Sequence, residues 1–242
     1  MGGGGIGSWR AWQRSISAIP RVLTTVPIRD PIKIIKPALF VLMLVPLALL
    51  IQKGFTHRLG ANPILKIEHE LGDWGLRFLL MTLAFTPLRR LTGWQPMMRL
   101  RRMFGLYVFF YACLHFLTWL VFDNSLDIHD IARDIAKRPY VTVGFSAFVL
   151  LVPLAITSTN KMVKRLGGRQ WRKLHSLVYP IGTLVILHYL WLVKADRHLP
   201  IIYGLILIGL LATRVPGFFK RIPVPASRRI APPPVRTVPQ PT

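Results

Sequence analysis

The segment WRKLHSLVYPIGTLVILHYLW, residues 171–191, is apolar over a length that can cross a bilayer, and it contains two histidines, His175 and His188. A helix that spans the hydrocarbon layer needs ~20 mainly apolar residues. Ionisable residues inside such a helix are costly and usually functional. The two histidines are thirteen positions apart, which corresponds to ~20 Å along a helix axis. The segment therefore predicts a membrane helix with histidines at two depths.

The whole chain combines an apolar composition with a large positive charge. Of its 242 residues 52% are hydrophobic, the mean hydropathy is +0.43 and the formal net charge is +23. A nucleic-acid-binding protein of this charge would be more polar, and its basic residues would form one continuous face instead of flanking apolar segments. The composition indicates a membrane protein that contacts lipid, and it excludes nucleic acid as a partner.

The apolar residues fall into six continuous segments. Each is close to the ~17–25 residues of a membrane-crossing helix, and none shows the alternation of a membrane β-strand. We therefore expect an all-α membrane protein, a six-helix transmembrane bundle. The expected spans are Ile35–Ile51, Leu71–Leu91, Met103–Phe122, Tyr140–Thr157, Leu174–Val193 and Leu199–Thr213.

The distribution of charge predicts the orientation and the domain boundaries. The basic N-terminal region, the 89–102 and 161–173 loops and the C-terminal tail together hold 23 of the 32 Lys and Arg residues. Cytoplasmic loops carry such an excess, so both termini are expected to be cytoplasmic. We expect a basic, poorly ordered arm over 1–34, a transmembrane domain over 35–213 and a basic, Pro-rich tail over 214–242.

Three histidines lie at membrane depth in the expected spans. Counted from the cytoplasmic ends, His115 in the third span lies ~17 Å and His188 in the fifth ~21 Å into the membrane. Imidazoles at one depth on two helices can bind the two faces of a haem iron. His175 lies nearer the cytoplasm, where it could bind a second haem. A shared face with His188 requires a distorted helix, which Pro180 can provide.

Other interpretations of these histidines stay open, because they could hold a different ligand or be structural. A proton relay or a metal transporter would need acidic, Cys or Met side chains at mid-depth, and the expected spans lack such clusters. His69, at the outer mouth of the second span, is a lesser candidate ligand. Arg77, one turn inside that span, could pair with haem propionates or extend to the membrane surface.

Four stretches carry motifs of a known family. They are RFLLMTLAFTPLRRL, RLRRMFGLYVFFYACLHF, RPYVTVGFSAFVLLVPLAITST and WRKLHSLVYPIGTLVILHYLWLVK, and together they cover about residues 60–215. The chain thereby resembles the MsrQ (YedZ) family, the haem-bearing membrane subunit of a bacterial methionine sulfoxide reductase system. That family belongs to the ferric-reductase-like transmembrane domains.

The resemblance implies a multi-pass protein of the bacterial inner membrane, with residues 35–213 as its haem domain. It implies an electron-transfer subunit, not a self-contained enzyme. Electrons would pass from quinol or a flavin reductase, through haem b, to a periplasmic, MsrP-like molybdopterin reductase that repairs oxidised proteins. FMN is a further cofactor that the resemblance alone implies. By motif, His115 and His188 are the axial pair, His175 is the ligand nearer the cytoplasm, and His69 is a further candidate.

The chain departs from the oxidase-type relatives, which place two histidines on each of two helices. Arg101 and Arg102 stand where the second ligand of the third span would belong. One haem is therefore expected, and a second haem at His175 is an alternative that lacks an obvious partner ligand. The sequence has no Gly-rich phosphate loop of a nucleotide-binding domain. The alternative functions are a cytochrome b type quinol or ferric reductase subunit and a non-redox membrane anchor.

Overall fold

The computed structural model describes residues 31–193 and 197–215, and every regular element in them is helical. The predicted arm therefore lies almost wholly outside the described residues, and so does most of the predicted tail. The helices are α2 (Pro31–Leu42), α3 (Val45–Phe55), α4 (Pro63–Thr92), α5 (Met97–Thr118), η1 (Trp119–Asp123), α6 (Ile128–Lys137), α7 (Pro139–Ile156), α8 (Asn160–Leu166), α9 (Gly168–His175), α10 (Val178–Leu192) and α11 (His198–Ala212).

Four helical stretches are long and apolar enough to cross a membrane. They coincide with four of the six expected spans. Of the other two, α4 carries Asp73 and Arg77 among its apolar residues, and α11 has only 15 residues. The prediction of a helical membrane protein is confirmed, whereas six crossings remain a prediction. The four stretches are Ile35–Phe55, Met97–Asp123, Pro139–Ile156 and Gly168–Leu192.

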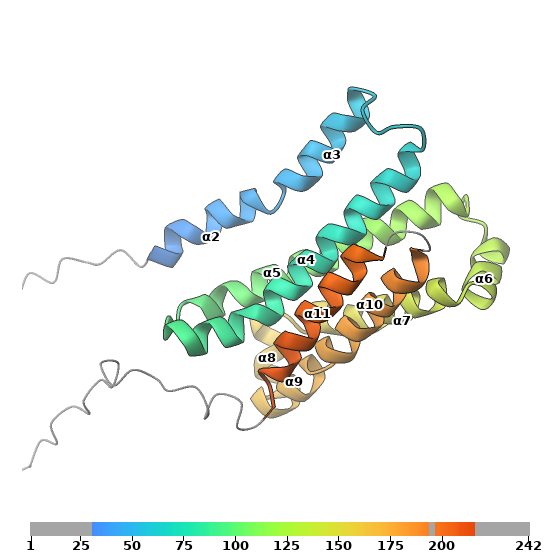
Figure 1. Cartoon of the computed structure of the whole chain (residues 1–242). Helices are drawn as coiled ribbons and strands as arrows, with labels where there is room; N and C mark the ends of the chain where they lie inside the picture. The colour runs from blue at the N-terminus through green and yellow to red at the C-terminus, as the bar shows by residue number, and fades with distance from the viewer. Residues whose placement is uncertain (1–30, 194–196, 216–242) are drawn as a thin grey trace, which may run out of the picture. The chain divides into compact units, whose positions relative to one another are not determined.

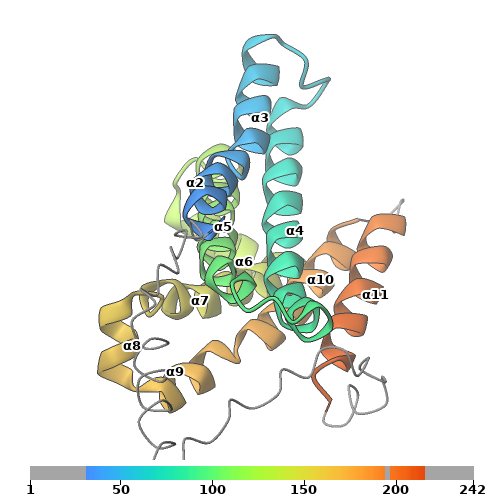
Figure 2. The same cartoon turned by 90° about the vertical axis from the view of Figure 1, so that its left-hand side faces the viewer.

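The chain divides into two units, Met1–Leu39 and Phe40–Thr242. The described part of the first unit is the start of α2, and the second unit contains the helices that pack into a bundle. Figure 1 shows α8 and α9 at the end of this bundle where α4 turns into α5, and α6 at the opposite end. Figure 2 shows α11 beside α4, and it also packs against α10.

The antiparallel pair of α4 and α5 is the most extensive contact of the bundle. The Asn62 side chain caps α4 by accepting the Leu65 N–H at 3.2 Å, which satisfies one of the free donors of the first turn. Gly93, at φ +72°, ends the helix in the left-handed conformation that glycine adopts without strain. The reversal lets α5 return along α4 and bury their shared apolar face, which includes Leu76, Leu79, Leu83, Phe104 and Val108.

Two tyrosines of α5 fix the N-terminal helices of the second unit. Tyr111 is fully buried, and its hydroxyl donates to the Met43 carbonyl at 2.8 Å. Tyr107, one turn earlier, donates to the Phe40 carbonyl at 2.7 Å. Both rings lie against Phe78 of α4. A membrane-buried hydroxyl needs such a partner, because the hydrocarbon offers none.

The second main helix pair consists of α7 and α10. The expected fifth span, Leu174–Val193, is not one continuous helix, because it is interrupted at Ser176 and Leu177 between α9 and α10. The interruption begins four residues before Pro180. A proline has no N–H and its ring crowds the carbonyl four residues earlier, so the Ser176 carbonyl instead accepts the Tyr179 N–H at 3.1 Å. The two histidines of the segment therefore lie on different helices.

Candidate cofactor site

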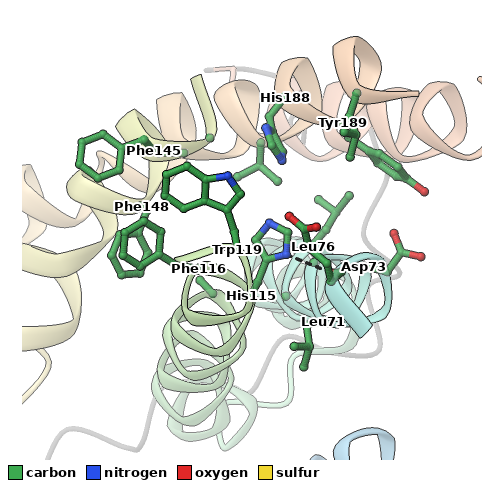
Figure 3. Close-up of a pocket in the computed structure, with 18 of the residues that line it drawn as sticks. Leu71, Asp73, Leu76, His115, Phe116, Trp119, Phe145, Phe148, His188 and Tyr189 are labelled. Carbon is green, nitrogen blue, oxygen red and sulfur yellow. Dashed lines mark hydrogen bonds between the residues drawn. The ribbon is translucent and has the colours of Figure 1, made fainter. Parts of the chain in front are cut away.

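A cavity lies between α4, α5, α7 and α10. The space between its walls is about 1230 Å³ when the open solvent at its mouth is included, and the enclosed part is about 160 Å³. Aromatic rings form one wall, and Phe116 and Phe148 stack with their centroids 4.6 Å apart. Trp119 and Phe145 extend this wall (Figure 3). This apolar, aromatic lining suits a flat and mainly apolar ligand.

His115 of α5 and His188 of α10 face each other across the cavity (Figure 3). Their ring centroids are 6.2 Å apart and their planes are 77° apart. The two residues are 73 positions apart in the sequence. They meet because α5 and α10 each pair with a different neighbour, α4 and α7, and the two pairs close around the cavity.

A backbone carbonyl fixes the orientation of each imidazole. The Nδ1 atom of His115 lies 2.9 Å from the Glu68 carbonyl oxygen, and that of His188 lies 2.7 Å from the Tyr140 carbonyl oxygen. A carbonyl only accepts hydrogen bonds, so both Nδ1 atoms carry the proton and donate it. Nε2 then keeps its lone pair in both rings, which is the state of a histidine that binds a metal.

The donor set fits an iron with two axial imidazoles. Metal–imidazole bonds of ~2 Å to one nitrogen of each ring place the two centroids roughly 6 Å apart, close to the observed 6.2 Å. Among the described residues no group of three or more His, Cys, Asp or Glu side chains could hold a bare metal ion. A metal at this place would have to bring its other ligands with it, as haem iron does.

Comparison with known proteins identifies the family. The sequence-family model named ferric reductase like transmembrane component matches residues 71–186. The chain is 55% identical over 197 residues to the protein-methionine-sulfoxide reductase heme-binding subunit MsrQ of Herminiimonas arsenicoxydans, covering 80% of this chain and 90% of the relative. It is 52% identical to the MsrQ of Ralstonia nicotianae over 76% of this chain and 86% of the relative. The MsrQ of Azospira oryzae is 46% identical over 89% of this chain and 93% of the relative.

The chain belongs to the MsrQ family. The resemblance that the four sequence motifs indicate is thereby confirmed, and so is the ferric-reductase-like character of the membrane domain. The names of these relatives describe heme-binding subunits of a methionine sulfoxide reductase. The match to the ferric reductase like component contains His115 and His175, and it ends two residues before His188.

Polar residues line the part of the cavity that includes the first turns of α4. His69 belongs to this lining, with Glu68, Asp73, Tyr140 and Tyr189. Burial raises the pKa of the Glu68 carboxyl to about 7, and the negative charge of Asp123 adds to this rise. The sequence-predicted His69 therefore shares the cavity with His115 and His188, on its polar side.

The side chain of Arg77 contacts residues of α4 and α11. Its Nε donates to the Tyr203 hydroxyl at 2.9 Å, and its Nη2 lies 3.7 Å from the Asp73 carboxylate. The guanidinium also lies over the Trp74 ring, 4.7 Å from the ring centroid. Arg77 is not among the residues that line the cavity. In this MsrQ family member the arginine connects α4 to α11.

His175 is separate from the cavity. Its ring stacks on Trp171 with the centroids 3.9 Å apart, and its Nδ1 lies 3.1 Å from the Trp171 carbonyl oxygen. Its Nε2 lies 3.5 Å from the Ser158 hydroxyl. The Trp171 indole in turn donates to the Thr157 carbonyl at 3.0 Å. These contacts hold the His175 ring between α9 and the end of α7.

The residues that hold the two facing imidazoles were not predicted from the sequence. These are the carbonyls of Glu68 and Tyr140 and the glycines that pack against the rings, Gly72 and Gly144. A backbone carbonyl leaves no signal in a sequence, because every residue has one. The glycines themselves are visible in the sequence, near the starts of the second and fourth expected spans. Glycine is frequent in membrane helices, so these two positions did not stand out.

Proposed function

We propose that the chain is a b-type haem electron-transfer subunit of a protein-methionine-sulfoxide reductase system. The observation that carries this proposal is the facing pair of His115 and His188, each with its Nδ1 bonded to a carbonyl. The names of the relatives support it. A haem at this place supplies a one-electron carrier whose potential the protein sets through the ligands and their surroundings.

The residues of the chain do three things in this proposal. His115 and His188 each keep an Nε2 lone pair for the iron, and the carbonyls hold the orientation of both rings. The aromatic wall around Phe116 and Phe148 keeps water away and keeps the polarity low. The polar side of the cavity, with Asp73 and Tyr189 in its lining, is the side from which the electron leaves for the partner in this proposal.

The finer assignments extend this proposal. We propose a multi-pass protein of the bacterial inner membrane, with six crossings over residues 35–213 and cytoplasmic termini. Quinol or a flavin reductase donates the electrons, and a periplasmic, MsrP-like molybdopterin reductase accepts them. His175 binds a second haem if one is present, His69 is a further candidate ligand, and FMN is a further candidate cofactor. The positive charge at the end with α8 and α9 supports the orientation.

The test of function is electron delivery. The haem-loaded protein is reduced in detergent, mixed with the purified periplasmic reductase and oxidised methionine peptide, and followed by its visible absorption. Reoxidation that requires both additions supports the proposed function. Reoxidation at one rate with and without the reductase contradicts it, and reoxidation by quinone or ferric iron alone favours a quinol or ferric reductase subunit. A protein that never takes up haem favours the membrane anchor.

A further inference from the structure

We propose that Gly72 and Gly144 are positioning residues for the two axial imidazoles. Each glycine follows, by one helical turn, the residue whose carbonyl binds the imidazole: Gly72 follows Glu68, and Gly144 follows Tyr140. We name each carbonyl–glycine pair a cradle. The inference rests on the proposed haem site, and it adds which residues set the position and the tautomer of its ligands.

The cradle of His188 lies on α7. The His188 Nδ1 atom is 2.7 Å from the Tyr140 carbonyl oxygen. A Cβ atom on Gly144 would lie 2.7 Å from that Nδ1 and 2.9 Å from Cε1. Real Cβ atoms essentially never approach a neighbour this closely. Any side chain at residue 144 therefore pushes the imidazole off the carbonyl.

The cradle of His115 lies on α4 and is wider. The His115 Nδ1 atom is 2.9 Å from the Glu68 carbonyl oxygen. A Cβ atom on Gly72 would lie 3.3 Å from both Nδ1 and Cε1 of the ring. A methyl group fits here when the ring moves by a few tenths of an ångström. The two cradles thus predict effects of different size.

The spacing of four residues has a physical reason. A helical side chain points toward the N-terminus and covers the turn before its own Cα. The carbonyl of the residue four positions earlier already accepts one N–H of the helix, and it has a second lone pair. A glycine four residues later leaves the most room for the ring of an outside donor to reach that lone pair. A carbonyl and a glycine one turn apart therefore form a docking point for an imidazole N–H.

The same arrangement occurs in both main helix pairs. In the first pair, α4 holds the histidine of α5, and in the second, α7 holds the histidine of α10. Each imidazole is thus fixed by its own helix partner, and the two pairs bring their fixed rings together. The distance between the two Nε2 atoms then depends on the packing between the pairs, while each ring orientation is set within its pair.

A purely structural role for these glycines makes a different prediction. Small residues let membrane helices approach closely whatever lies opposite. Gly182 of α10 is such a residue, because its Cβ would lie 3.2 Å from Leu207 of α11, as crowded as at Gly72. Gly105 of α5 has only an ordinary contact, 4.0 Å from Thr82. Gly182→Ala therefore controls for crowding between helices, and Gly105→Ala controls for the exchange of glycine for alanine itself.

The test compares four variants of the haem-loaded full chain, Gly144→Ala, Gly72→Ala, Gly182→Ala and Gly105→Ala, by visible and EPR spectra and by reduction potential. We expect Gly144→Ala to lose the low-spin, two-imidazole spectrum. We expect Gly72→Ala to keep that spectrum with a shifted potential, and both controls to match the wild type. If Gly144→Ala keeps the wild-type spectrum and potential, the cradle is refuted, although the haem site stands. A wild type without haem refutes the proposed function itself.

Imidazole rescue decides the question if Gly144→Ala does not fold. His188→Gly removes the crowded ring and leaves the iron open to added imidazole. The double variant with Gly144→Ala should need roughly tenfold more imidazole to recover the low-spin spectrum, since it lacks the carbonyl hydrogen bond. Equal half-saturating concentrations in the single and double variants would refute the cradle on α7.

Discussion

Replacing Arg77 by methionine tests whether this residue serves the helix bundle or the cofactor. In the structure Arg77 joins α4 to α11 through the Tyr203 hydroxyl at 2.9 Å, the Asp73 carboxylate at 3.7 Å and the Trp74 ring at 4.7 Å. Methionine keeps the apolar stem of the side chain and removes all three polar contacts. The variant should therefore lose stability and leave the cofactor unchanged.

The size of the effect follows from exposure. A hydrogen bond from a charged donor contributes ~1.5–3 kcal/mol in a protein interior, but hydrogen bonds between membrane helices average only ~0.6 kcal/mol. The side chain of Arg77 is 33% exposed, so the ion pair with Asp73 adds less than ~1 kcal/mol. The contact with Trp74 adds ~0.5–1 kcal/mol. We expect Arg77→Met to lower the free energy of unfolding by about 2 kcal/mol.

Reversible unfolding by a denaturing detergent in mixed micelles measures this loss. The matched control is Tyr203→Phe, which removes one hydrogen bond from the other side and keeps the arginine charge. The double variant gives the coupling between the two residues, expected near ~1 kcal/mol. The haem potential should change by less than ~59 mV, a tenfold change in a one-electron equilibrium. A larger shift, or loss of haem without loss of stability, would mean that Arg77 pairs with the haem carboxylates.

Three further results are expected. Tyr111→Phe should lower the free energy of unfolding in mixed micelles by ~1 kcal/mol, because the Tyr111 side chain is fully buried. This loss should exceed that of Tyr107→Phe, and a loss equal to or smaller than that of Tyr107→Phe would contradict the reasoning. His175→Ala should keep the low-spin visible spectrum, because its ring lies outside the cavity; loss of that spectrum would place it at the iron. With Cys113 replaced by serine, a single cysteine at Lys164 should react with an impermeant thiol reagent only in broken cells, and one at Arg133 should react in intact spheroplasts; the reverse pattern would overturn the orientation.

The sequence predicted the helices well, because a bilayer constrains composition strongly. A spanning helix must be apolar over its whole length. The third expected span therefore lies within the observed α5–η1, and the fourth agrees with α7 to within one residue at each end. The meeting of His115 and His188 followed from depth alone, since a rise of 1.5 Å per residue converts sequence position into height. Depth does not give direction around the helix axis. The facing of the two rings required the packing of two helix pairs.

The surroundings of the other candidates could not be predicted for the same reason. Thirteen residues of an ideal helix would leave His175 and His188 on different faces, and a bend near Pro180 was expected to correct this. The helix is instead interrupted one turn earlier, at Ser176, because a proline disturbs the carbonyl four residues before it. His175 then ends α9 and packs on Trp171. Local sequence shows that a helix breaks, but long-range packing decides where the side chain goes.

The central claim is that one iron lies between His115 and His188, and the EPR spectrum of the oxidised, haem-loaded protein tests it most directly. The wild type should give the low-spin signal of two imidazole ligands. His115→Ala and His188→Ala should each lose that signal and become high-spin or lose the haem, while both proteins stay folded by circular dichroism. A wild type that stays colourless with haem freely supplied, or either variant with an unchanged low-spin signal, would contradict the claim.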